Sequence, residues 1–164
     1  MPDEWIRQWG DPTLRMTAAP IACIDEVLRG QVKRMRQRLV KADGAGLAAT
    51  QVGLMRRLFV FRVEPDGDVD VLVNPEVVGR SRETAVFHEG CLSFNSVTVA
   101  VRRAVAVRVA GQDLDGRRRV LDAEGFAASL LQHEIDHLDG ILTLDRAAPE
   151  ERRRAMSELI ADAA

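Results

Sequence analysis

The stretch QHEIDHLDG, residues 132–140, decides the interpretation of the chain because it places two metal-binding side chains on one predicted helix. His133 and His137 are four residues apart, so both project from the same helix face. Glu134 is rotated by about 100° from His133, and its carboxylate is expected to reach a water on the ion. Gly140 is expected to end the helix in a left-handed conformation. The stretch is typical of a catalytic metal site.

The helix is expected to extend upstream of the histidines, with Asp122 as its N-cap and Leu138 near its end. Phe126 and Leu130 lie on the same face as the two histidines, at spacings of four, three and four residues. They are therefore predicted to form an apolar wall beside the ion.

A catalytic ion normally needs a third protein ligand, and the sequence offers several candidates for it. One class of zinc peptidases uses a further histidine six residues after the second, but this chain has Thr143 there. Glu158 is an alternative, although it stands in a charged surface pattern. Cys91, in HEGCLSF (88–94), is the better candidate because a thiolate binds zinc or iron strongly. Cys23 is interpreted as a small buried hydrophobic residue.

The rest of the chain predicts an α+β domain, with a mostly antiparallel β-sheet packed around the metal-binding helix. An N-terminal helix is expected from Asp25 to about Ala42, with a buried stripe of Leu28, Val32, Met35 and Leu39. A C-terminal helix is expected from about Pro149 to Ala161, with Met156, Leu159 and Ile160 on its apolar side and solvated arginines at 152–154. Between them, short β-branched segments separated by turn residues predict strands at 58–63, 69–73, 83–87, 97–101, 104–109 and 117–121.

Composition limits the classes of protein to consider. The 164 residues are 46% hydrophobic, which fits one domain spanning residues 1–164. A net charge of −2 disfavours a surface for DNA or an anionic membrane, and no apolar run approaches the ~20 residues of a membrane span. The N-terminal residues lack the apolar core of a signal peptide, and the two cysteines form no disulfide framework. We therefore expect a cytoplasmic protein.

Three blocks of the sequence resemble the motifs of the peptide deformylase family: GAGLAATQ (44–51), EGCLS (89–93) and QHEIDH (132–137). Their order and separations also fit, and IRQWGDPTLR (6–15) and LVNPEV (72–77) are similar, so the resemblance covers nearly the whole chain. It implies a bacterial-type metallohydrolase that removes the formyl group from the N-terminal methionine of newly made proteins and releases formate. The implied partners are nascent formyl-methionyl peptides and the ribosome near them.

The same resemblance implies roles for individual residues. The ligands would be Cys91, His133 and His137, holding one ion, usually Fe(II) and alternatively zinc, nickel or cobalt. Glu134 would be the acid/base, and Gln51 with the backbone N–H of Leu92 would stabilise the oxyanion. The substrate-binding positions would be Gly44, Ala45, Gly46, Phe87, Glu89, Gly90, Phe126, Ser129 and Leu130. Glu89 would pair with an arginine, either Arg103 or Arg102.

The chain departs from the family pattern at three positions, none of which removes a catalytic group. Asn95 stands where many members have proline, Thr98 replaces an arginine that contacts the substrate backbone, and Ser129 replaces an aliphatic residue. We expect an active enzyme with weaker peptide anchoring. His88 is interpreted as a solvent-facing residue.

Two alternatives remain open from the sequence. A metallopeptidase or another amidase could use the same helix, in which case Cys91 would not be required for metal binding. A catalytically silent metal-binding or ribosome-associated module is the second alternative. The intact Glu134 and Gln51 argue against it, since such a module needs neither residue.

Overall fold

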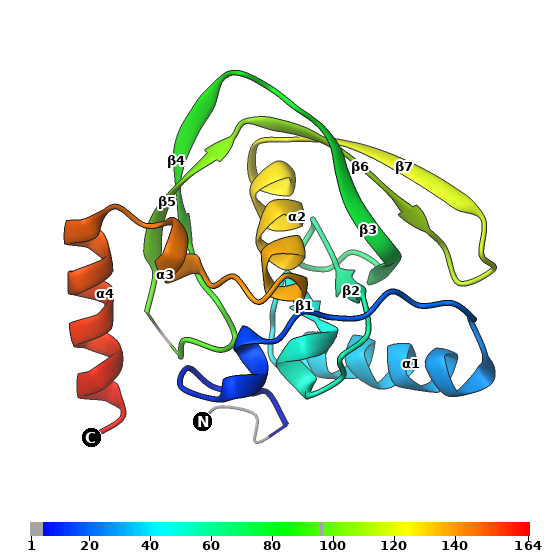
Figure 1. Cartoon of the computed structure of the whole chain (residues 1–164), viewed down its shortest axis with the longest axis horizontal. Helices are drawn as coiled ribbons and strands as arrows, with labels where there is room; N and C mark the ends of the chain where they lie inside the picture. The colour runs from blue at the N-terminus through cyan, green and yellow to red at the C-terminus, as the bar shows by residue number, and fades with distance from the viewer. Residues whose placement is uncertain (1–4, 96) are drawn as a thin grey trace.

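A single helix, α2, lies at the centre of the molecule with strands on both sides (Figure 1). The computed structural model describes residues 5–95 and 97–164. Its helices are α1 (Glu26–Lys41), α2 (Gly125–Leu138), α3 (Thr143–Arg146) and α4 (Pro149–Asp162), with 3-10 turns at Pro12–Arg15 and Ala49–Val52. Its strands are β1 (Gly46–Ala48), β2 (Leu58–Phe61), β3 (Asp70–Arg80), β4 (Thr84–Glu89), β5 (Val99–Ala104), β6 (Ala106–Gln112) and β7 (Arg118–Glu124).

The strands form two separate antiparallel sheets. The larger has the order β1-β2-β3-β6-β7, and the smaller pairs β4 with β5. The predicted α+β class with mostly antiparallel strands is therefore confirmed. Because β4 ends at Glu89, the smaller sheet delivers the segment with Cys91 to the side of α2 (Figure 1).

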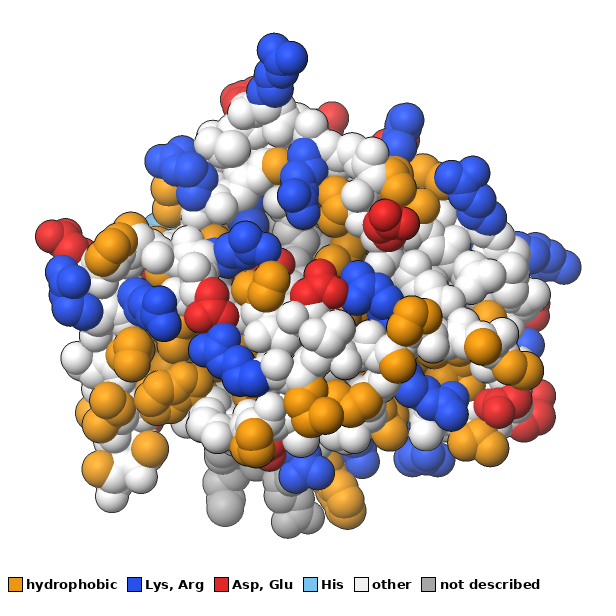
Figure 2. All heavy atoms as spheres, viewed as in Figure 1, with side chains coloured by type: hydrophobic (Ala, Val, Ile, Leu, Met, Phe, Trp, Pro, Cys, Tyr) orange, Lys and Arg blue, Asp and Glu red, His pale blue; other side chains and the backbone are white. Residues whose placement is uncertain are grey.

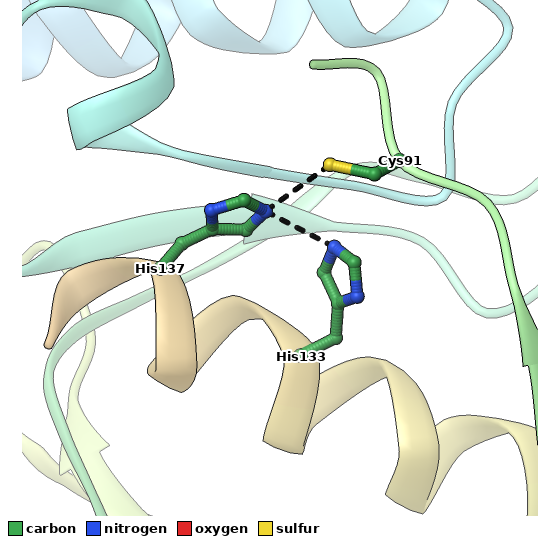
Figure 3. Close-up of side chains that lie close together, drawn as sticks. All are labelled: Cys91, His133 and His137. Carbon is green, nitrogen blue, oxygen red and sulfur yellow. Dashed lines mark hydrogen bonds between the residues drawn. The ribbon is translucent and has the colours of Figure 1, made fainter. Parts of the chain in front are cut away.

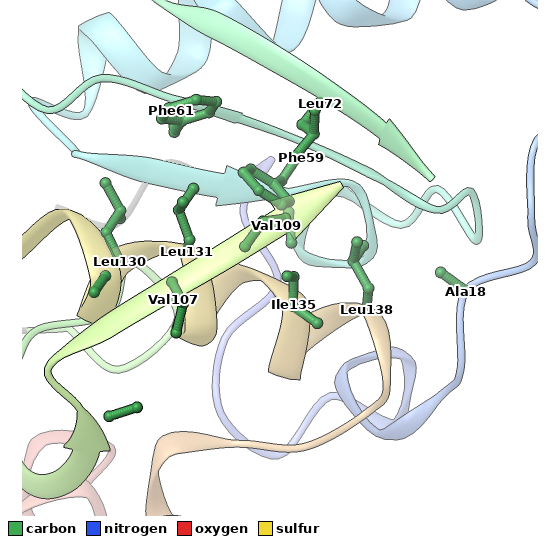
Figure 4. Packing of buried hydrophobic residues seen from close by; sticks show 13 residues of the cluster. Ala18, Phe59, Phe61, Leu72, Val107, Val109, Leu130, Leu131, Ile135 and Leu138 are labelled. Atoms are coloured by element: carbon green, nitrogen blue, oxygen red, sulfur yellow. The ribbon is translucent and has the colours of Figure 1, made fainter. Parts of the chain in front are cut away.

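The larger sheet is covered on both faces, which explains why the four residues of β2 are all buried. Phe59 and Phe61 belong to a cluster with Leu131, Ile135 and Leu138 of α2 (Figure 4). Leu58 and Val60 point to the opposite face of the sheet, where they join the buried stripe of α1. This stripe consists, as predicted, of Leu28, Val32, Met35 and Leu39.

The start of α1 and the end of α2 follow from local capping chemistry. The Asp25 carboxylate accepts a hydrogen bond from the Leu28 N–H at 2.8 Å and caps α1 as predicted. Gly140 adopts a φ of +71° directly after the cap of α2, also as predicted. The prediction that Asp122 caps α2 is wrong, because β7 continues through Asp122, which pairs with Arg108 on β6.

Two burial predictions are also wrong. Ile160 is 57% exposed, whereas Leu159 is buried as predicted, together with Ala155, and Met156 packs partly buried against the same cluster. Ile160 follows Leu159 by one position and is therefore rotated by about 100° from the buried stripe. Cys23 is exposed rather than buried, because it lies in the irregular segment before α1.

The surface mixes charges of both signs. On the face shown in Figure 2, basic and acidic side chains are interspersed, with hydrophobic side chains among them. The surface of the molecule also carries exposed ion pairs such as Arg108–Asp122 and Arg154–Glu158. Among the described residues, no helix combines the length and the hydropathy that a membrane span requires.

Candidate metal centre

Three predicted ligands converge beside α2. His133 and His137 project from successive turns of this helix, and Cys91 approaches from the segment after β4 (Figure 3). His137 Nε2 lies 3.1 Å from His133 Nε2 and 3.3 Å from Cys91 Sγ. All three residues are buried, and their candidate ligand atoms lie within 4.8 Å of one another.

This donor set fits a divalent cation. Burial, followed by the charge of His133, lowers the pKa of His137 well below its usual value, so its ring is neutral and has a lone pair to offer. His133 Nδ1 lies 2.9 Å from a carboxylate oxygen of Glu89. Without a cation, burial would lower the pKa of His133, but contacts with Cys91 and Glu89 raise it well above its usual value. With Nδ1 donating to Glu89, a cation that displaces the second ring proton would meet the Nε2 lone pair on the side of His137 and Cys91. Two imidazole nitrogens and a sulfur form a ligand set suited to zinc or iron.

Glu89 links the ligand His133 to a buried arginine. It forms a bidentate ion pair with Arg103, with 2.8 Å between Nε and Oε1 and 3.0 Å between Nη2 and Oε2. Burial would raise the pKa of Glu89, but hydrogen bonds from His133 and Arg103 lower it to about 2. The structure therefore selects Arg103 over Arg102 as the partner, because Arg102 alternates to the exposed face of β5.

Glu134 lies at the bottom of the site. Its side chain is 2% exposed, and its Oε2 has no hydrogen-bond partner within the described part of the chain. Burial raises its pKa to about 7 in the absence of a cation. Gly46 of β1 packs directly against it, since a Cβ at Gly46 would come within 2.2 Å of Glu134 Oε1. Gly46, the second glycine of the GAGLAATQ block, is thus required for the close approach of β1 to the Glu134 carboxyl group.

Gln51 is held with its amide nitrogen toward the metal cluster. Its Oε1 accepts a hydrogen bond from the Ala48 N–H at 2.9 Å, which fixes the orientation of the amide. Its Nε2 donates to Ser93 Oγ at 3.0 Å and lies 3.6 Å from Cys91 Sγ. The carboxamide therefore presents a donor beside the cluster.

These side chains border a cavity of about 370 Å³. Phe126 is 56% exposed at its edge, whereas Leu130 is buried in its wall. His137 is the one residue predicted to contact the metal, the oxyanion or the substrate that does not line this cavity. The others do line it: Gly44, Ala45, Gly46, Gln51, Phe87, Glu89, Gly90, Cys91, Leu92, Phe126, Ser129, Leu130, His133 and Glu134.

Other residues considered from the sequence lie elsewhere or act differently. Glu158 is on the exposed side of α4, bound to Arg154, and is absent from the metal cluster. Thr98 is exposed, and its carbonyl accepts a hydrogen bond from Arg154 at 2.7 Å. His88 is exposed as expected but also borders the cavity, as does Asn95.

Three residues that support the site were not predicted. Ser93 fixes Gln51, and Asp136 bridges Arg103 and Arg146 through 2.5 and 2.8 Å contacts. Ser93 and Asp136 both lie inside the motif blocks, so their positions in the sequence could have marked them as candidate site residues. Arg62 on the loop after β2 donates to the carbonyl of Gly44 at 2.9 Å, and no pattern in the sequence marks it.

Comparisons with known proteins agree with this geometry. Residues 3–153 match the family model described as polypeptide deformylase. The peptide deformylase of Thermotoga maritima is 43% identical over 147 residues, covering 90% of this chain and 88% of that protein. The peptide deformylase of Rhizobium meliloti is 41% identical over 138 residues, covering 82% and 79% of the two proteins. A crystal structure of a peptide deformylase from Legionella pneumophila superposes with a TM-score of 0.90 at 37% identity, covering 95% of this chain and 92% of that one.

Proposed function

This chain belongs to the polypeptide deformylase family, and from that premise we propose that it hydrolyses the N-formyl group of formyl-methionyl peptides with a divalent cation held by Cys91, His133 and His137. One observation carries the proposal. A buried cluster of one sulfur and two imidazole nitrogens lies next to Glu134, a buried carboxyl group whose Oε2 has no partner among the described residues. A purely structural metal site has no use for such a group.

A divalent cation in this site supplies Lewis acidity, which lowers the pKa of water and polarises a carbonyl oxygen. Glu134 takes a proton from the attacking water as its oxygen bonds to the formyl carbon. The same carboxyl group then gives the proton to the departing amine, so that formate and a free N-terminus are released.

The developing oxyanion is stabilised by groups that are already in place. The Gln51 amide is fixed by Ala48 at Oε1 and by Ser93 at Nε2, so the second Nε2 hydrogen, which lies on the side of Cys91 Sγ, is the one that turns to the oxyanion. The Leu92 N–H is the second donor, on a segment that is held by a hydrogen bond from Gln8 to the Leu92 carbonyl. Losing one such donor typically costs about 10²–10³ in turnover.

The cavity accounts for substrate recognition. The methionine side chain enters between Phe87, Phe126 and Leu130, while Gly44 to Gly46 leave room for the peptide backbone. Residues 1–164 act as one catalytic domain in the cytoplasm, on nascent chains near the ribosome. The resident ion is proposed to be Fe(II), which is what the resemblance to the family implies. Zinc, nickel or cobalt could replace it, because a mixed sulfur and nitrogen set accepts all of these.

The proposal is tested by formate release from formyl-Met-Ala-Ser, with metal content measured on protein purified without oxygen. We expect about one metal ion per chain, and activity that is lost in air together with ferrous iron. Air-stable activity with zinc as the only metal would contradict the assignment of iron. Cleavage of internal peptide bonds without formate release would instead support the metallopeptidase alternative.

Two variants separate the catalytic group from the ligands. Glu134→Ala is expected to abolish formate release while retaining the metal. Cys91→Ser is expected to lose most of the metal, whereas a metallopeptidase that does not use Cys91 would retain it. Glu158→Ala is the matched control, because Glu158 is an exposed acid outside the cluster and its removal should leave both metal and activity unchanged.

A further inference from the structure

The hydroxyl group of Ser129 has an unexpected partner. Serine replaces an aliphatic residue at this position of the cavity wall, and its polarity would ordinarily be expected to affect the substrate pocket. A helical serine commonly bonds to the carbonyl group four residues earlier. Ser129 Oγ instead lies 2.8 Å from Glu89 Oε1, and both residues are buried. The hydroxyl is thus used by the network behind the ligand His133.

The Glu89 carboxylate accepts hydrogen bonds from two elements, α2 and β5. Ser129 and His133 are one helical turn apart on α2, and each donates to a different oxygen of the Glu89 carboxylate, at 2.8 and 2.9 Å. Arg103 on β5 donates to the same two oxygens from its own fork, at 2.8 and 3.0 Å. Each carboxylate oxygen therefore accepts two hydrogen bonds, and the plane of the carboxylate cannot rotate without breaking one of them.

We propose that Ser129 is a positioning residue for the metal site: it completes the donor set of Glu89 and thereby fixes the His133 ring with Nε2 toward Cys91 and His137. The inference rests on the proposed function of the metal cluster. Groups that orient a ligand histidine tune metal affinity because they set both the ring direction and its basicity. Ser129 contacts Glu89 and not His133 directly, so its effect on metal affinity is expected to be smaller than that of Glu89.

The experiment measures zinc affinity by competition with a chelator, together with the rate of zinc release, and needs no enzyme activity. Loss of a direct partner of a ligand histidine typically weakens metal binding by roughly 10–100-fold. For Ser129→Ala we expect about a 3- to 10-fold loss of affinity and a similar acceleration of release, at or below the lower end of that range. Ser129→Thr retains the hydroxyl and is expected to restore wild-type values.

Thr143→Val is the matched control for the loss of a buried hydroxyl. Thr143 is 3% exposed at the start of α3, and its Oγ1 has no partner among the described residues. We expect this variant to bind zinc as tightly as the wild type. Urea unfolding of the zinc-free proteins is measured in parallel, and the Ser129→Ala effect on affinity should exceed any effect on the stability of the zinc-free state.

Three outcomes would overturn the inference. One is unchanged zinc affinity in Ser129→Ala, including the case in which only the KM for formyl-Met-Ala-Ser changes, because Ser129 would then be a wall of the cavity alone. Another is an equal loss in Ser129→Thr, which retains the hydroxyl group, because the hydroxyl would then not be the cause of the effect. A loss of affinity matched by Thr143→Val would assign it to general destabilisation. Failure of the proposed function is recognised separately, as absent formate release by the wild-type protein.

Discussion

The contact between Gly46 and Glu134 leaves no room for a methyl group on residue 46. A Cβ on residue 46 would lie 2.2 Å from Oε1, 2.6 Å from Cδ and 2.9 Å from Cγ of Glu134. Gly46 is not among the glycines with positive φ, so its backbone conformation is open to alanine. Gly46→Ala therefore acts on the position of the Glu134 carboxyl group rather than on the strand.

The size of the displacement follows from the same distances. Real Cβ atoms essentially never come closer than 3.0 Å to another heavy atom, so Oε1 must move by at least 0.8 Å, the difference between 3.0 and 2.2 Å. A misplacement of about 1 Å can cost roughly 10²-fold in rate. We expect kcat for formyl-Met-Ala-Ser to fall by about 10²-fold, which corresponds to about 2.7 kcal/mol of transition-state stabilisation.

The assay compares kcat with metal content and with thermal unfolding. Gly46→Ala should retain its metal, because the ligand atoms are untouched. Gly30→Ala on α1 is the control: its nearest neighbour would be Arg34 NH1 at 3.7 Å, and alanine there should keep full activity and add about 0.5–1 kcal/mol of stability. Activity of Gly46→Ala within about threefold of the wild type would refute the reasoning, because the position of Glu134 would then not limit the rate.

Further predictions concern the loop at Gly44, the position of Thr98 and a surface ion pair. Arg62→Ala removes the buried donor to the Gly44 carbonyl, and we expect a several-fold higher KM for formyl-Met-Ala-Ser with a smaller change in kcat; an unchanged KM would mean that the loop holds its shape without Arg62. Thr98→Arg adds a donor for the peptide backbone and should lower KM; no improvement, with a KM already in the range of its relatives, would contradict the idea of weak anchoring. Arg119 hydrogen bonds lower the pKa of Asp70 against the effect of burial. Because the folded-state pKa is depressed, the pair stabilises the protein above the ordinary value of 3.8 and this contribution is lost as pH falls through the lowered pKa. Urea unfolding should therefore show Asp70→Asn to be less stable than the wild type by at most about 1 kcal/mol at pH 6, with the difference shrinking below about pH 4.

The sequence predicted α1 and the end of α2, which depend on interactions between residues close together in the chain. The stripe of α1 and its cap at Asp25 follow from helical periodicity and from a side chain bonding to a nearby N–H. The end of α2 at Gly140 depends on a single left-handed residue. By contrast, β3 continues beyond the predicted end at Val73 through Asn74 and Pro75, because pairing with β6 on the other side supports the strand past its bulge.

The start of α2 is also set by strand pairing rather than by local capping chemistry. Asp122 has the chemistry of an N-cap, and an isolated peptide has no reason to prefer another role for it. In the folded chain, β6 provides a partner along the whole of β7, and Arg108 provides an ion pair for the Asp122 carboxylate. The N-cap position is therefore Glu124, two residues later than predicted, and the helix begins at Gly125.

The sequence by itself determined the metal-binding chemistry, because His133, Glu134 and His137 lie within one and a half turns of a helix whose geometry is known in advance. It also indicated Cys91 as the remaining ligand, through the resemblance of the block around it. Only the tertiary structure decided how Cys91 reaches the histidines, which arginine binds Glu89 and that Ser129 turns its hydroxyl toward Glu89. These contacts join residues that are 14 to 46 positions apart in the chain, and their geometry is set by how two sheets pack around α2 rather than by any local preference.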